Sequence, residues 1–206
     1  MTALTDRMTA ALDDYAAWQG PLFEDFHRRP ELAMREVHTR GAIAELLTEY
    51  GYAVHEIGGG VVGVLDNGAG PAVLMRADID GLPVQEASGL PYASTHTQVG
   101  EDGEPTATMH ACGHDLHIVA GLGAAKLLAD HQGDWSGTYI ALFQPGEEIA
   151  AGARSMVEDG LTRKLPRPDV CLGQHVLTSP TAGKAAVAPG PVLSSAVSMK
   201  VVARGS

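Results

Sequence analysis

The sequence has few of the residues on which secreted, membrane-spanning or nucleic-acid-binding proteins depend. Its 206 residues include only 2 cysteines, which excludes a disulfide framework and favours an intracellular protein with a ligand or reactive thiol. Lysine and arginine total 14 against 25 acidic residues, a net charge of −11 without a basic block, so nucleic acid and anionic membranes are not expected partners. No apolar run could span a bilayer, and Asp6, Asp13 and Asp14 stand where a signal peptide would be apolar. We therefore expect a cytoplasmic protein.

Aromatic residues make up only 5 % of the chain although 45 % is hydrophobic, so the core must consist mostly of Ala, Val, Leu and Ile. Apolar periodicity predicts helices over 3–29, 35–50, 116–130 and 150–159, and strands over 61–65, 72–76, 136–143 and 168–172. Pro21 is expected to kink or split the first helix, and 86–108 reads as an irregular loop. The repeated succession of strand and helix predicts an α/β fold with a layered sheet that is at least partly parallel.

The segment from His110 to His117 holds three histidines, one cysteine and one aspartate within eight residues. Sulfur and imidazole ligands together suit a zinc-type ion, and Gly113 would let the backbone turn so that Cys112 and His114 reach one point. The alternative is a polar loop with one inert buried thiol. We favour the metal site, because buried polar groups this crowded need a shared partner.

Further polar side chains follow three predicted strands. Asp78 comes after 72–76, Glu147 and Glu148 after 136–143, and His175 after 168–172. In open α/β sheets the strand ends assemble the site, so we expect these groups to converge on Cys112 and His114. The alternative is that the acids merely cap loops or stabilise a helix start.

The adjacent Glu147 and Glu148 suggest a division of labour. A carboxylate bound to a metal loses much of its basicity, so one residue serves poorly as both ligand and base. Two neighbours can hold the ion and take the proton of an activated water separately.

Five segments resemble the aminoacylase/carboxypeptidase-type metallohydrolases, in particular the branch of hippurate hydrolase, N-acyl-amino-acid amidohydrolases and auxin-conjugate hydrolases. They read FHRRPELAMRE, MRADIDGLPVQE, MHACGHDLHIVAGLGAA, FQPGEEIAAGARSMVEDG and GQHV. The resemblance implies a three-layer αβα sandwich around a mixed, mostly parallel sheet, as in zinc exopeptidases, with the start of a small α+β lid domain. It also implies a metal-dependent amidohydrolase that cleaves N-acyl amino acids or related conjugates.

The same resemblance implies the roles of the candidate residues. Cys112 would bridge two divalent ions, zinc in the first instance, with manganese, cobalt or nickel as alternatives. His114 and His175 would complete the protein ligands of one ion, and Glu148 would bind the other ion. Glu147 would act as general base and then as general acid. Asp78 would orient a ligand. Arg76 stands where other branches carry a metal-binding His. The residues left as supporting or structural candidates are Asp80, His110, Asp115 and His117.

The chain departs from the family pattern at its end. We expect residues 1–190 to be the N-terminal part of the catalytic domain and 191–206 to begin a lid that would also mediate homodimerisation, with a strand over 196–202. The alternative function is a catalytically incomplete metal-binding fragment that lacks the lid and a last His ligand. A thiol switch using Cys112 and Cys171 is a third reading, disfavoured because it leaves Glu147 and Glu148 without a role. Cys171 is expected to be a buried, inert thiol.

Overall fold

The computed structural model describes residues 3–100, 103–192, 195, 197, 199 and 201–205. The chain divides into two compact units, Met1–Val176 and Leu177–Ser206. The described part of the second unit contains no helix or strand. The strand expected over 196–202 falls partly outside the described residues and stays a prediction.

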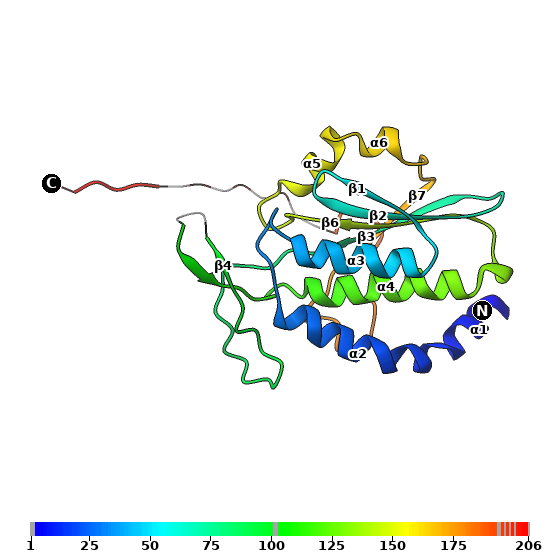
Figure 1. Cartoon of the computed structure of the whole chain (residues 1–206), viewed down its shortest axis with the longest axis horizontal. Helices are drawn as coiled ribbons and strands as arrows, with labels where there is room; N and C mark the ends of the chain where they lie inside the picture. The colour runs from blue at the N-terminus through cyan, green and yellow to red at the C-terminus, as the bar shows by residue number, and fades with distance from the viewer. Residues whose placement is uncertain are drawn as a thin grey trace. The chain divides into compact units, whose positions relative to one another are not determined.

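The first unit is built on a five-stranded sheet in the order β1-β2-β6-β3-β7 (Figure 1). The strands are β1 (Ala53–Ile57), β2 (Gly60–Asn67), β3 (Ala72–Asp78), β6 (Gly137–Gln144) and β7 (Val170–Gly173). β1 and β2 pair antiparallel, as do β2 and β6, whereas β3 lies parallel to both β6 and β7. The predicted mixed α/β sheet is confirmed. Its parallel half comprises the three strands that precede the candidate site residues, so their carboxyl ends share one edge.

Helices cover both faces of this sheet because β6 is apolar on both sides. Tyr139, Ala141 and Phe143 belong to the core under α2 (Leu12–Arg28), α3 (Val37–Glu49) and α4 (His114–Asp130). Ile140 and Leu142 face the opposite layer, where they pack with Met156 of α5 (Gly152–Glu158). The short α6 (Leu161–Lys164) follows α5 on that face (Figure 1). Alternate residues of one strand therefore fill two cores, as expected of a central strand.

The N-terminal helical region breaks at Ala11, between α1 (Ala3–Ala10) and α2, and not at Pro21. Pro21 lies inside α2, so the helix is not split there. Both Pro21 and Ala17, whose carbonyl loses its usual donor, are exposed, so water can replace the missing hydrogen bond. Among the described residues, no helix is both long and apolar enough to cross a bilayer.

Two further differences concern short strands. β1 was not predicted, and the expected irregular loop over 86–108 contains a small hairpin of β4 (Thr97–Val99) and β5 (Pro105–Ala107). β4 and β5 have three residues each, too few to show an alternating apolar pattern, which explains why the sequence gives no sign of these two strands.

The prediction that Cys171 is buried was wrong. Cys171 is exposed, as are all four residues of β7. β7 is the edge strand of the sheet and pairs along one side only, with β3. The apolar residues of β7 suggested burial, but the described residues leave this strand exposed.

Candidate metal centre

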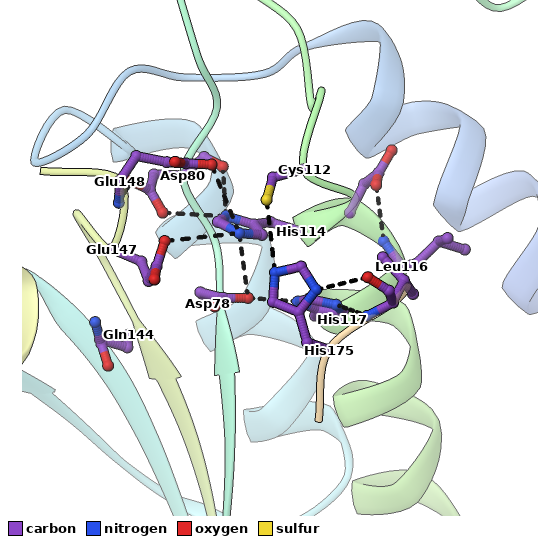
Figure 2. A network of polar contacts seen from close by, with 12 residues as sticks. Asp78, Asp80, Cys112, His114, Leu116, His117, Gln144, Glu147, Glu148 and His175 are labelled. Carbon is purple, nitrogen blue, oxygen red and sulfur yellow. Dashed lines mark hydrogen bonds and ion pairs between the residues drawn. The ribbon is translucent and has the colours of Figure 1, made fainter. Parts of the chain in front are cut away.

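The carboxyl edge of β3, β6 and β7 meets the start of α4, and the six predicted site residues gather there (Figure 2). Three overlapping groups of side chains place metal-binding atoms within 4.8 Å of one another: Cys112, His114 and His175; Asp78, His114 and His117; and His114, Glu147 and Glu148. His114 belongs to all three groups and is the centre of the cluster.

Gly113 sets the local geometry of this cluster. It adopts φ +78° as the residue preceding α4, a left-handed conformation that glycine tolerates best. A Cβ at this position would lie 2.4 Å from Cγ2 of Val176, the residue after His175. The turn therefore needs glycine both for its backbone angle and for the close approach of the segment that carries His175.

The orientation of His114 is fixed by Asp80. The imidazole is fully buried, and its Nδ1 lies 2.9 Å from the backbone carbonyl oxygen of Asp80 and 3.2 Å from Oδ1 of the same residue. Nδ1 must carry the proton to donate to the carbonyl, so in the neutral imidazole, the form that binds a metal, Nε2 keeps its lone pair for the cluster. The other carboxylate oxygen, Oδ2, accepts the backbone N–H of Glu148 at 3.0 Å. One aspartate thus positions two of the candidate ligands.

The unpaired atoms of the cluster fit a bound cation. Nε2 of His114 and Oε1 of Glu148 are both buried without a hydrogen-bond partner among the described residues, and they lie 3.9 Å apart. Sγ of Cys112 and Nε2 of His175 are separated by 3.5 Å. Metal–ligand bonds of about 2.0 to 2.3 Å bring donor atoms to separations of this size. The residues present therefore match a divalent ion in both chemistry and spacing.

Electrostatics favour the same conclusion. Burial, followed by the neighbouring Glu148, Glu147 and Asp78, raises the pKa of the Cys112 thiol to about 11. Burial and repulsion from Glu147 and Asp80 also raise the pKa of Glu148, although His114 and Cys112 oppose the shift. A bound cation would reduce the repulsion among these carboxylates and would favour the thiolate form of Cys112 over the thiol.

Asp78 contacts two histidines and one arginine. Its Oδ1 is hydrogen-bonded to Nδ1 of His117 and lies 3.7 Å from Nε2 of His114, while Oδ2 lies 2.8 Å from Nη1 of Arg76. Burial would raise the pKa of Asp78, but the hydrogen bond from His117 and the charges of His114 and Arg76 outweigh it and lower the value to about 2. Asp78 is therefore held as an anion, and Arg76 acts as its counter-ion.

His117 connects Asp78 to the third strand end. Its ring is buried, and Nε2 accepts the backbone N–H of Val176 at 2.9 Å. This contact holds the segment that carries His175, whose ring centroid lies 4.7 Å from that of His117. The spacing of His114 and His117 by three residues places both on one face of α4, and that was the available sequence signal for this role.

The two remaining candidates are buried beside the cluster. Burial lowers the pKa of His110 to about 4, so this imidazole is neutral. Asp115 lies 2.6 Å from Nδ1 of His27, whose Nε2 lies 3.1 Å from Glu86. Asp115 therefore ties the first turn of α4 to α2 and to the loop that follows β3.

Comparison with known proteins shows the family. The model of peptidase family M20/M25/M40 matches residues 74–205. The chain is 37 % identical over 182 residues to an N-acetyl-L-cysteine deacetylase of Bacillus subtilis, covering 87 % of this chain and 41 % of that protein. It is 39 % identical over 184 residues to the hippurate hydrolase of Campylobacter jejuni, covering 87 % and 45 %. The chain thus spans less than half the length of these relatives.

Solved structures agree. A putative aminohydrolase from methicillin-resistant Staphylococcus aureus superposes with a TM-score of 0.73 at 30 % identity, covering 83 % of this chain and 42 % of that one. A dinuclear metal binding peptidase of the M20 family from Bacillus subtilis gives 0.68 at 35 % identity, covering 79 % and 43 %. The resemblance drawn from the sequence motifs is confirmed, and the chain belongs to the M20/M25/M40 peptidase family.

Proposed function

We propose that this chain carries the metal centre of an amidohydrolase that cleaves the amide bond of N-acyl amino acids or related conjugates. The observation that supports this most directly is a pair of buried atoms without a hydrogen-bond partner among the described residues, Nε2 of His114 and Oε1 of Glu148, beside an accessible Glu147. Relatives named for the deacetylation of N-acetylcysteine and the hydrolysis of hippurate support the substrate class.

In this proposal the ligands are Cys112, His114, His175 and Glu148, with Cys112 shared by two ions. Bound divalent ions would supply Lewis acidity toward water and the substrate carbonyl. Zinc is our first choice because sulfur and imidazole predominate among the ligands, with manganese, cobalt and nickel as alternatives.

Glu147 is suited to proton transfer. Its side chain is 38 % exposed, and Oε2 lies 4.0 Å from Nε2 of His114, so the carboxylate borders the cluster and still reaches solvent. It would take the proton of the attacking water and then deliver it to the leaving nitrogen of the amide. Glu148, with a side chain 19 % exposed and its amide fixed by Asp80, is the better placed of the two to remain a ligand.

A cavity of about 590 Å³ opens beside Glu148. Its walls are largely apolar and include Leu32, Ala33, Leu82, Pro83 and Ile149. Arg35 and Thr106 also line it, so the cavity offers apolar walls together with one cationic side chain. This combination agrees with an N-acyl amino acid, which has an apolar acyl group and a carboxylate.

The test is metal analysis of the purified protein together with a screen of N-acetyl and N-benzoyl amino acids. We expect hydrolysis that a chelator abolishes and that added zinc or manganese restores. A protein that holds its ions and cleaves none of these amides would contradict the proposed activity.

The coverage of 41 to 46 % of the Bacillus subtilis and Campylobacter jejuni relatives favours one alternative, a metal-binding part of an enzyme that is incomplete by itself. Intact mass spectrometry with metal stoichiometry separates the two functions. A 21.5 kDa chain with one tightly bound ion and negligible turnover supports the alternative, whereas two ions and unaided hydrolysis exclude it.

Metal affinity should rise with pH. The raised pKa of Cys112, about 11, means that the thiol is protonated near neutrality and that a bound ion must displace this proton. Proton release on binding strengthens affinity as protons become scarcer, by about tenfold per pH unit for one proton. We expect this slope for zinc between pH 6 and 8 in competition with a chromophoric chelator. Cys112→Ser should show a slope lower by about one proton, and a pH-independent affinity in the unmodified chain would rule out a thiolate ligand.

A further inference from the structure

Two backbone N–H groups of the turn that carries Glu147 and Glu148 donate hydrogen bonds to side chains from other segments of the chain. The N–H of Gly146 donates to Oε1 of Glu36 at 2.7 Å, and the N–H of Glu148 donates to Oδ2 of Asp80 at 3.0 Å. Both acceptors are buried, at 1 % exposure each. Glu147 therefore lies between two amides that are each held by a buried carboxylate.

The turn is also tightly wound. Gly146 has φ +53°, and its carbonyl accepts the N–H groups of both Ala151 and Gly152 at 3.1 Å. Ala150 has φ +53°, a left-handed conformation that is uncommon for a residue other than glycine. Such backbone persists only where the surroundings hold it in place, so the external anchors bear directly on the shape of this turn.

The anchoring segment is itself closely fitted to the turn. Met34, two residues before Glu36, also has a positive φ, at 64°. A Cβ added to Gly146 would lie 2.6 Å from Sδ of Met34. The chain that bears Glu36 thus packs directly against the residue whose amide Glu36 accepts, although the two are 110 positions apart in the sequence.

We propose that Glu36 is a positioning residue that holds Glu147 and Glu148 at the metal centre by accepting the N–H of Gly146. The inference rests on the proposed function, because it concerns the geometry of the same site. Loss of the acceptor leaves a buried N–H unpaired, so the turn must shift to satisfy it. A displacement of about 1 Å at a catalytic group can lower the rate on the order of 100-fold.

A second buried glutamate in the same segment provides a matched control. The carboxylate oxygens of Glu31 accept the N–H groups of His38 at 3.0 Å and Thr39 at 2.7 Å, in the first turn of α3. Glu31 therefore satisfies donors that the helix start leaves free, at a different place from the turn at Gly146. Glu31 and Glu36 are both buried and both accept backbone amides, but Glu36 is the one that holds the turn preceding the candidate ligands.

The experiment compares Glu36→Ala, Glu36→Gln and Glu31→Ala. Amide hydrogen exchange of the 145–152 segment should accelerate at least tenfold in Glu36→Ala and stay unchanged in Glu31→Ala, which should instead loosen 37–40. Glu36→Gln retains an acceptor oxygen and should restore most of the protection. Burial raises the pKa of Glu36 to about 7, so a neutral side chain is already well populated there at neutral pH.

The second readout is the metal centre of the Co²⁺-loaded protein. In Glu36→Ala the visible absorption spectrum should change and kcat for amide hydrolysis should fall by about 10- to 100-fold with KM little altered. Glu31→Ala should keep the spectrum. If Glu36→Ala does not fold, Glu36→Asp decides, because its carboxylate is one methylene too short to reach the N–H of Gly146. Exchange at 145–152 should then be faster in Glu36→Asp than in Glu31→Asp.

The outcomes separate the two proposals. Equal exchange at 145–152 and identical Co²⁺ spectra in Glu36→Ala and Glu31→Ala would overturn the positioning role and leave the proposed function standing. If the unmodified chain binds no Co²⁺, the proposed function fails, and faster exchange at 145–152 in Glu36→Ala would then mark Glu36 as a structural anchor only.

Discussion

Replacing Glu147 with glutamine should lower kcat by about 100- to 10,000-fold, the usual contribution of a positioned general base, while leaving the metal content unchanged. The amide keeps the size of the side chain but cannot take the proton of the attacking water. Glu147 is the more exposed of the two glutamates and lies at the border of the cluster, so its replacement should not remove a buried ligand. Steady-state kinetics and metal analysis on the same preparation measure both quantities.

Glu148→Gln is the matched control for this result. Its Oε1 is buried without a hydrogen bond from any described residue, and its backbone N–H is fixed by Asp80, so the substitution should weaken metal binding and lose activity through the missing ion. Saturating metal should therefore recover part of the activity of Glu148→Gln and none of that of Glu147→Gln. Equal metal content and equal, unrecoverable loss in the two variants would mean that the roles are not divided in this way.

Much of the sheet could be predicted because its strands contain apolar runs that are visible in the local sequence. The Tyr139–Phe143 run is apolar at every position, as a strand covered on both faces must be, and it is the central strand β6. The order of strands has no such signal. β6 lies between β2 and β3, which follow one another in the sequence, and only long-range pairing determines that arrangement.

The exposure of Cys171 and the place of the helix break have the same physical origin, since each depends on surroundings and not on the residue itself. Cys171 sits in an apolar run, but β7 is an edge strand and its residues are exposed. Pro21 is a strong helix breaker, yet it lies within α2 on an exposed position, whereas the break falls at Ala11. Alanine is the best helix former, so no local preference marks that position.

At the candidate metal centre, the structure brings together all six residues that the motifs singled out. What the sequence could not specify was their support. Asp80 orients His114 partly through its backbone carbonyl, which any residue possesses, and Glu36 reaches Gly146 across 110 positions. Such contacts follow from the packing of separate segments, and a motif of neighbouring residues does not contain them.

Cys112→Ser should lower zinc affinity by more than about 100-fold, the largest effect expected of any single change to the ligands. Loss of a supporting residue typically costs about 10- to 100-fold, and a ligand shared by two ions should cost more. Serine keeps the shape of the side chain, but its hydroxyl is a harder and far less acidic ligand than a thiol. Competition titration against a chromophoric chelator measures the affinity, with circular dichroism to verify the fold.

Cys171→Ser is the control, because its thiol is exposed on β7 and belongs to none of the groups of metal-binding atoms found among the described residues. It should bind zinc like the unmodified chain and change stability little, since an exposed edge position has few packing contacts to lose. The accessible Cys171 should also react with an alkylating reagent in the metal-loaded protein, whereas Cys112, if it binds the metal, should be shielded until a chelator is added. Equal loss of zinc in the two serine variants would reveal a cysteine pair and would refute the assignment of Cys112 as the shared ligand.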